Sequence, residues 1–150
     1  FNVFMMKKIF VLLLVAVMAL PNLVNAQKIS KQDKVLGKWF SEDKKGVVEI
    51  YKVGNKYNGK IVEILDKNAE RYDINNPDPS KRKQSKLGLV ILKNFVFDDD
   101  EWEDGTIYDP KNGKTYSCVM ELENDNVLEI TGYIGITLFG RTAIWTRKLD

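Results

Sequence analysis

Three side chains with acid, base and hydrogen-bonding chemistry lie on two neighbouring segments: Glu49 and Tyr51 on the first, and Lys60 on the second. The segments 47–53 and 56–65 are β-branched and alternating, and the Gly-Asn pair between them is typical of a two-residue hairpin turn. In that hairpin Glu49 faces Lys60. On an outer surface such a pair contributes only about 0.2 to 1 kcal/mol. Inside a barrel it would anchor the polar head of a ligand, because buried charges persist only when paired. The sequence leaves both orientations open.

The composition excludes much enzymatic chemistry, because the chain contains no histidine. Ser-His-Asp and Cys-His catalysis, histidine-containing zinc sites and histidine pH switches are therefore ruled out. An enzyme would have to use carboxylates such as Glu49 or Glu63 as acid and base, and nothing in the sequence supplies that geometry. Cys118, the only cysteine, lies in a strand-like run, where a free thiol behaves as a small hydrophobe. We expect no catalytic residue, no metal site and no cofactor.

A glycine-punctuated apolar segment, 132–140, is a second candidate for binding. It is either a buried strand junction or a flexible lip over a cavity. As a lip it would present Ile136, Leu138 and Phe139 to an apolar ligand, a membrane or a partner. Tyr133, Ile136 and Phe139 complete the predicted ligand-binding set that begins with the hairpin.

The first 26 residues have the organisation of a signal peptide. Lys7 and Lys8 form a positive region, residues 9–20 form an uncharged apolar run, and Val24-Asn25-Ala26 supplies a plausible cleavage site. The apolar run is too short to cross about 30 Å of hydrocarbon. We therefore expect a mature protein over 27–150 that is exported to the periplasm or the exterior and does not span the membrane.

Length and charge bound the mature protein further. Residues 27–150 are enough for one domain with its own core. Removing two signal-peptide lysines from the 23 basic residues leaves 21, which equals the 21 acidic residues. A net charge near zero argues against a nucleic-acid partner, whose recognition rests on a basic footprint. A single cysteine also means that the domain has no internal disulfide.

Alternating apolar runs separated by turn signals predict an all-β fold. The Asp-Pro-Lys-Asn-Gly sequence at 109–113 is a strong hairpin turn, because Pro presets the bend and Gly accepts a positive φ. No segment of the mature chain shows sustained 3.6-residue periodicity. Strands are predicted over 47–53, 56–65, 87–97, 102–108, 114–122, 127–133 and 141–149.

One region interrupts the series of strands: residues 75–83 are polar, proline-containing and basic. Asp78 is placed to cap a helical turn that begins at Pro79, so we predict a short helical turn in the loop near 78–86. The loop is either a solvated connection or a contact for an anion or a partner through its basic residues, Lys81, Arg82, Lys83 and Lys86.

Two clusters bracket the mature chain, Gly37-Lys38-Trp39 near its start and Trp145-Thr146-Arg147 near its end. In lipocalin-like barrels a Trp at the head of the first strand packs under an Arg from the last strand and plugs one end through a cation–π contact. Trp39 and Arg147 have this placement. We therefore predict a single antiparallel lipocalin-like barrel of the calycin type, with Trp39 and Arg147 as its structural plug.

Eight short strings, in order, resemble an exported bacterial family catalogued as domain of unknown function number 2147. The resemblance covers the whole mature chain and implies an exported, lipocalin-like barrel with no agreed biochemical activity. Many relatives carry a Cys where this chain has Asn58, so no role of that cysteine carries over. The strings are Val35-Leu36-Gly37-Lys38-Trp39, Val48-Glu49-Ile50-Tyr51, Gly59-Lys60-Ile61-Val62, Asn76-Pro77-Asp78-Pro79, Gly105-Thr106-Ile107-Tyr108-Asp109-Pro110, Gly113-Lys114-Thr115-Tyr116, Gly132-Tyr133-Ile134-Gly135, and Gly140-Arg141-Thr142 to Trp145-Thr146-Arg147.

Three classes of function follow from these residues. The favoured class is a barrel that binds a small apolar or amphipathic ligand, since short strands can enclose one such molecule. The alternative is a non-enzymatic structural or protein-interaction module of the cell envelope, its interior filled by aromatic side chains, with a protein partner that the sequence does not identify. An enzyme is the least favoured. The presence or absence of a cavity separates the first two classes.

Overall fold

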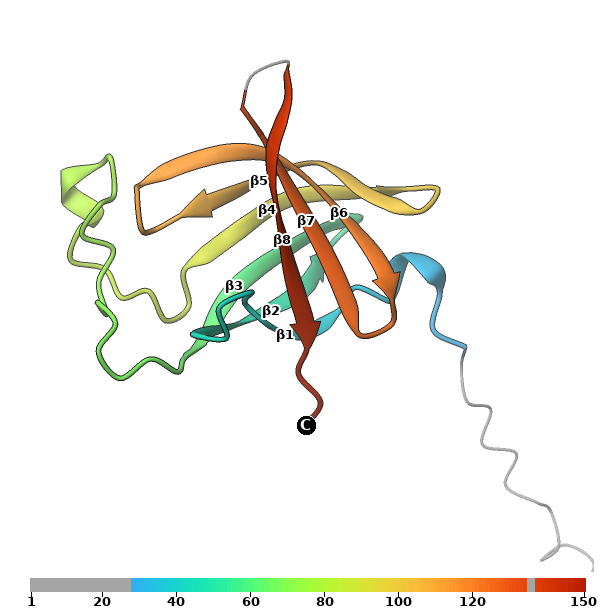
Figure 1. Cartoon of the computed structure of the whole chain (residues 1–150), viewed down its shortest axis with the longest axis horizontal. Helices are drawn as coiled ribbons and strands as arrows, with labels where there is room; N and C mark the ends of the chain where they lie inside the picture. Colours follow the sequence, from blue (N-terminus) through green and yellow to red (C-terminus); the bar gives the residue numbers. More distant parts are fainter. Residues whose placement is uncertain (1–27, 135–136) are drawn as a thin grey trace, which may run out of the picture.

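The computed structural model of the chain describes residues 28–134 and 137–150. Eight strands form one closed antiparallel barrel in which each strand pairs with the next and β8 pairs with β1 (Figure 1). Two short 3-10 turns, η2 and η3, accompany the strands. The elements are η2 Lys31–Asp33, β1 Gly37–Phe40, β2 Gly46–Val53, β3 Lys56–Ile64, η3 Pro79–Lys81, β4 Val90–Asp98, β5 Glu101–Asp109, β6 Lys114–Asn124, β7 Val127–Ile134 and β8 Thr137–Arg147.

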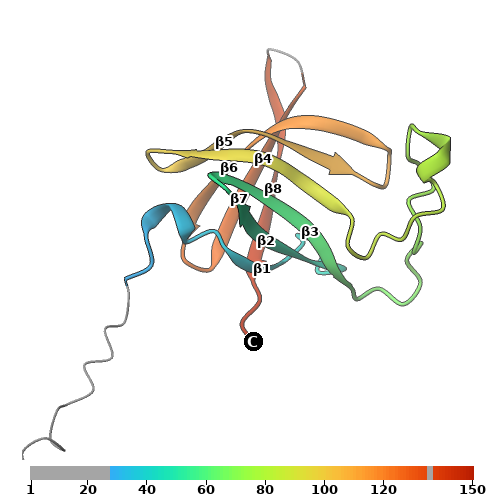
Figure 2. The same ribbon diagram turned by 180° about the vertical axis from the view of Figure 1, so that it is seen from behind.

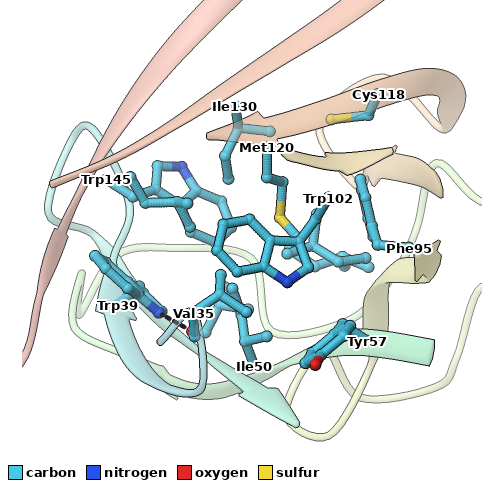
Figure 3. Packing of buried hydrophobic residues seen from close by; sticks show 14 residues of the cluster. Val35, Trp39, Ile50, Tyr57, Phe95, Trp102, Cys118, Met120, Ile130 and Trp145 are labelled. Carbon is cyan, nitrogen blue, oxygen red and sulfur yellow. Dashed lines mark hydrogen bonds between the residues drawn. The ribbon is translucent and has the colours of Figure 1, made fainter. Parts of the chain in front are cut away.

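Alternation along the strands decides what enters the core. In β2 the side chains of Val48 and Ile50 are buried, while Glu49 between them is partly exposed, as expected for a strand with one face on a core. The core is one cluster of side chains from all eight strands together with Val35 (Figure 3). Its largest members are the three tryptophans of the chain, Trp39, Trp102 and Trp145.

The connections between neighbouring strands alternate between the two ends of the barrel. One end carries η2 and the β2–β3, β4–β5 and β6–β7 turns, and we call it the closed end. The other carries the β1–β2 loop, the β5–β6 turn, the β7–β8 connection and the long β3–β4 loop of residues 65–89. We call it the open end. Figures 1 and 2 show the β3–β4 loop, with η3, standing away from the barrel wall.

The closed end is sealed by Trp39 and Arg147. Trp39 is fully buried, and the Arg147 guanidinium lies over its indole ring, 4.1 Å from the ring centroid. Arg147 Nη1 and Nη2 also donate to the carbonyl oxygens of Leu36 and Lys34, at 2.9 and 2.6 Å. Gly37 makes room for this arrangement: its φ of +118° favours glycine, and a Cβ would lie 3.2 Å from Arg147 Nη1. In the Gly37-Lys38-Trp39 string, the glycine is thus explained by its positive φ and the tryptophan by its cation–π contact with Arg147.

The 3-10 turn η2 covers the same end. The Trp102 indole N–H donates to the Gln32 carbonyl at 3.1 Å, and the Tyr57 hydroxyl donates to the Asp33 carboxylate at 2.7 Å. Lys52 also donates to Asp33, at 2.8 Å. Burial and the bond to Asp33 raise the pKa of Tyr57. Each aromatic ring at this end therefore buries its apolar part and gives its polar atom a partner.

The structure confirms the all-β, lipocalin-like barrel predicted from the sequence, including the Glu49–Lys60 register of the first hairpin. The helical turn in the β3–β4 loop is η3, where the Asp78 carboxylate accepts from the Ser80 amide. The last strand is longer than predicted: β8 begins at Thr137 and pairs with β7. Cys118 is buried in the core, and burial raises the pKa of its thiol to about 12. The predicted signal peptide lies outside the described residues.

Candidate functional site

A cavity of about 450 Å³ lies at the open end of the barrel. Pockets that hold small ligands have volumes of roughly 300 to 1,000 Å³. Strands supply an apolar lining, and loops together with the adjoining strand residues supply a polar rim. The lining includes Ile91, Ile107, Tyr108, Tyr116, Ile130, Ala143 and Trp145; the rim includes Ser41, Glu42, Asp43, Asp109, Lys111, Asn112 and Arg141.

The apolar lining is continuous with the core. Ile91, Ile130 and Trp145 line the cavity and are also buried members of the core cluster, and Figure 3 shows Ile130 and Trp145 grouped with the other core side chains. Ala143 lies opposite Ile130 in the β7–β8 pairing and presents only a methyl group. The cavity is thus space that the core side chains leave at the open end.

Two ion pairs connect loops across the rim. Arg141 on β8 pairs with Glu42 at 2.8 Å, and Lys111 in the β5–β6 turn pairs with Asp43 at 3.1 Å. Both carboxylates belong to the β1–β2 loop, so this loop is tied to two other elements. The cations are largely exposed, at 83 % for Arg141 and 78 % for Lys111. Exposed pairs of this type contribute about 0 to 1 kcal/mol, so they can exchange partners at little cost.

Asp43 has further partners besides Lys111. Burial disfavours its ionised form, but hydrogen bonds from Ser41 Oγ, the Lys45 amide and Lys111 outweigh that cost and lower the pKa of Asp43 to about 2. The carboxylate would therefore keep two donors if Lys111 moved to another anion. Lys111 is the exchangeable partner in this pair.

The β5–β6 turn that carries Lys111 is held from behind by the β3–β4 loop. Asn75 Nδ2 donates to the carbonyl oxygens of Pro110 and Lys111, at 3.2 and 3.0 Å. Gly113 in this turn has φ +71°, and a Cβ there would lie 1.9 Å from the Asn75 carbonyl oxygen. A side chain at Gly113 would separate the loop from the turn. The Asp-Pro-Lys-Asn-Gly sequence is therefore both a hairpin turn and a docking point.

A buried carboxylate, Asp73, fixes the loop on the barrel. Its side chain is fully buried and accepts hydrogen bonds from Tyr108 Oη at 2.7 Å, Asn76 Nδ2 at 2.7 Å and Gln84 Nε2 at 3.3 Å. Burial and the bond to Asp73 raise the pKa of Tyr108 to about 12. Tyr108 also lines the cavity, so this one side chain both anchors the loop and forms part of the cavity wall.

Three of the predicted binding residues come together on the outer face of the β2–β3 hairpin. Lys60 lies 3.3 Å from Glu49 and places its ammonium 5.2 Å from the centroid of the Tyr51 ring. The Lys60 and Glu49 side chains are 40 % and 36 % exposed. None of the three residues lines the cavity. Of the two orientations that the sequence left open, the structure has the outward one.

The other predicted binding residues lie on the last hairpin. Tyr133 is half-buried on β7 and is not among the residues that line the cavity. Ile136 lies outside the described residues, and so does the side chain of Phe139, whose backbone belongs to β8. Their role as a lip therefore stays a prediction.

Sequence reasoning missed most of the cavity. Ile91, Ile107 and Ile130 read as ordinary strand residues, and only their register around the barrel brings them together. The sequence indicates the buried position of Asp73 only weakly. A carboxylate between two apolar residues, Tyr72 and Ile74, is typical of an extended segment with a polar inner face. The sequence did not single out the rim cations, because Lys111 lies in a predicted hairpin turn and Arg141 lies in a predicted strand.

Within residues 28–134 and 137–150, no group of three His, Cys, Asp or Glu side chains is placed to hold a metal ion. Among the same residues, no helix has the length and apolar character needed to cross a membrane.

A closed antiparallel barrel with one aromatic-sealed end and a cavity at the other defines a lipocalin-like protein. The family model described as "Uncharacterized protein conserved in bacteria (DUF2147)" matches residues 37–147, and this chain belongs to that family. Among solved structures, the chain is similar to protein HP1028 from the human pathogen Helicobacter pylori, described as belonging to the lipocalin family. That match has a TM-score of 0.63 and 26% identity, and it covers 70% of this chain and 73% of the other. No protein with a curated description matches this chain.

Proposed function

We propose that the cavity at the open end binds a small amphipathic acid. The observation that carries this proposal is the combination of a 450 Å³ space, an apolar lining and a rim with two exposed cations. The apolar part of the ligand would lie against Ile130, Ala143 and Trp145. Its acid group would lie at the rim, near Lys111 and Arg141.

The rim favours an anionic head over a cationic one. Lys111 and Arg141 are each held by a single exposed ion pair, whereas Asp43 keeps donors from Ser41 and Lys45 when Lys111 leaves. A ligand carboxylate can therefore take a rim cation without leaving Asp43 unpartnered. A cationic ligand at Asp43 would have to compete with the several donors that this carboxylate already has. Charge-assisted hydrogen bonds to a carboxylate would then orient the head group.

Titration of a fluorescent medium-chain fatty-acid analogue into the mature protein tests the proposal. Ala143→Trp should abolish binding, because the added side chain fills the cavity. Lys111→Gln combined with Arg141→Gln should weaken binding about tenfold or more, as expected for loss of hydrogen bonds to a charged group. Lys60→Gln on the outer face is the matched control and should leave the affinity unchanged.

The result that would contradict the proposal is equal affinity in the wild type, the Ala143→Trp variant and the rim variant. Absence of binding across a panel of amphipathic acids would also contradict it. Either result would favour the other class considered above, a structural or protein-interaction module of the cell envelope.

We also propose that the protein is exported, as the organisation of its first 26 residues indicates. The support is the charged region followed by an uncharged apolar run and a cleavage site before Gln27. N-terminal sequencing of protein recovered from the extracytoplasmic fraction should begin near Gln27. Recovery of protein that retains Lys7 would contradict this proposal.

A further inference from the structure

The β3–β4 loop turns apolar side chains outward. Tyr72 pairs with Ser85 across the loop in antiparallel fashion, flanked by hydrogen bonds from the Asp73 amide to the Gln84 carbonyl and from the Lys86 amide to the Arg71 carbonyl, at 3.0 and 2.8 Å. Side chains alternate along such a ladder. Asp73 points toward the barrel and is buried, so its neighbours on both sides point away from the barrel.

The outward apolar residues are large and well exposed. Tyr72 is 53 % exposed, Ile74 is 50 % exposed, and Leu87, two residues beyond Ser85, is 51 % exposed. The loop is not a loose chain that could hide them, because Asp73 and Asn75 bind it to Tyr108 and to the β5–β6 turn. A rigid loop that buries polar groups and exposes apolar ones has the reverse of the usual surface pattern.

The same loop carries exposed basic side chains. The stretch 79–97 contains no Asp or Glu, and Lys81 and Lys83 near its start are exposed. Lys81 reaches Asp78 at 3.7 Å, while no ion pair among the described residues includes Lys83. Lys86 alternates with Ser85 and therefore lies on the barrel side of the loop, with Asp73 and Gln84. We call the surface formed by Tyr72, Ile74, Leu87, Lys81 and Lys83 the loop face.

We propose that the loop face docks on the surface of an anionic lipid bilayer. Apolar and aromatic side chains insert at the boundary between headgroups and acyl chains, and lysines are attracted to anionic headgroups. A bilayer fits better than a protein partner, because protein interfaces are depleted of lysine and this face has two lysines. Figures 1 and 2 show the loop as a projection from the barrel, which can reach a flat surface.

The loop face and the cavity share no residue. Asn75 joins the β3–β4 loop to the backbone carbonyl of Lys111, whose residue lies at the cavity rim. The loop face itself does not depend on the proposed ligand. Failure of cavity binding would leave this proposal intact, and Ala143→Trp should keep full vesicle binding.

Vesicle co-sedimentation tests the proposal directly. A protein that starts at Gln27 contains every element that the structure describes and lacks the apolar leader. It should bind vesicles that contain phosphatidylglycerol and not pure phosphatidylcholine vesicles, and added salt should weaken the binding. Replacing Lys81 and Lys83 by Gln should weaken binding about 25-fold, since each cation near an anionic surface strengthens it about fivefold.

A second variant, with Tyr72, Ile74 and Leu87 replaced by Ser, should weaken binding at least tenfold through loss of inserted apolar surface. The controls carry the same kinds of change elsewhere: Val53→Ser with Ile144→Ser, and Lys28, Lys56 and Lys93 replaced by Gln. They should bind as the wild type does. Equal losses in loop-face and control variants, or equal binding to both kinds of vesicle, would overturn the proposal. Absence of binding to either vesicle would also overturn it and would leave an acidic protein surface as the occupant.

Discussion

The two ends of the barrel are sealed by different chemistry. At the closed end the seal is aromatic: Trp39 is fully buried beneath Arg147, and the Trp102 indole donates to the backbone of η2. At the open end the seal is ionic, formed by Lys111 and Arg141 with carboxylates of the β1–β2 loop. The aromatic seal leaves little space, whereas the ionic rim surrounds a cavity of about 450 Å³.

This difference assigns a separate task to each end. Opening the closed end would expose large aromatic surfaces and would leave buried hydrogen-bond donors without acceptors, which costs several kcal/mol. Opening the open end would break ion pairs that contribute about 0 to 1 kcal/mol each. The closed end is therefore suited to stability, and the open end is suited to exchange of a ligand with solvent.

The largest expected effect is on the closed end. Trp39→Ala should lower the free energy of unfolding by about 3 to 5 kcal/mol, because it removes a large buried ring and its contact with Arg147. Urea denaturation measures this loss. Ile144→Ala on the outer wall is the control and should change stability by less than about 0.5 kcal/mol. A loss below about 1 kcal/mol for Trp39→Ala would show that the aromatic seal is not what stabilises this end.

A smaller loss is expected from the anchor of the β3–β4 loop. Asp73→Ala leaves Tyr108, Asn76 and Gln84 without their acceptor, and we expect a loss of about 2 to 3 kcal/mol. Limited trypsin digestion should then cut faster at Lys81–Lys83, while the barrel stays intact. Asp98→Ala, at the exposed β4–β5 turn, should not alter the digestion. An unchanged cleavage rate in Asp73→Ala would mean that other contacts hold the loop.

The open end should contribute less to stability than either of these groups. Lys111→Ala breaks an exposed ion pair, and we expect a loss of less than about 1 kcal/mol. The same urea denaturation that reports on Trp39→Ala measures it. A loss of 3 kcal/mol or more would contradict the assignment of the rim as an exchangeable seal.

A last prediction concerns the pH dependence of stability. The pKa of Tyr108 is raised from the ordinary 10 to about 12, so folding favours its neutral form. The contribution of this tyrosine to stability is therefore present below pH 10 and is lost as the pH rises from about 10 to about 12. Ultraviolet absorbance during an alkaline titration should show a tyrosine that ionises near pH 12, later than the others, and Tyr108→Phe should remove that signal. Persistence of that signal in the variant would assign it to another tyrosine, such as Tyr57.

The sequence predicted the barrel well because its strands and turns are local features. The Gly54-Asn55 turn, the Asp-Pro-Lys-Asn-Gly turn and the alternation of Val48, Glu49 and Ile50 each depend on a few adjacent residues. Trp39 and Arg147 were paired from a pattern at the two ends of the chain, and the structure has this contact.

The cavity was harder to predict because it depends on distances around the barrel. Ile91 and Ala143 meet at the cavity although they are far apart in sequence, and a cavity is defined by side chains too small to fill a space. Aromatic residues behave differently from one another: Tyr57 and Phe95 are packed in the core, while Tyr116 reaches the cavity. Which residues fill a barrel and which leave space is set by packing, and the sequence pattern does not report packing.

The three tryptophans allow one measurement of the difference between the ends. Trp39 and Trp102 belong to the closed end, and Trp145 lines the cavity. With fluorinated tryptophan in all three positions, fluorine NMR during a titration with decanoate reports on both ends at once. We expect the Trp145 signal to shift while the signals of Trp39 and Trp102 stay in place. A shift of Trp39 or Trp102 without a shift of Trp145, or no shift at any concentration, would contradict this expectation.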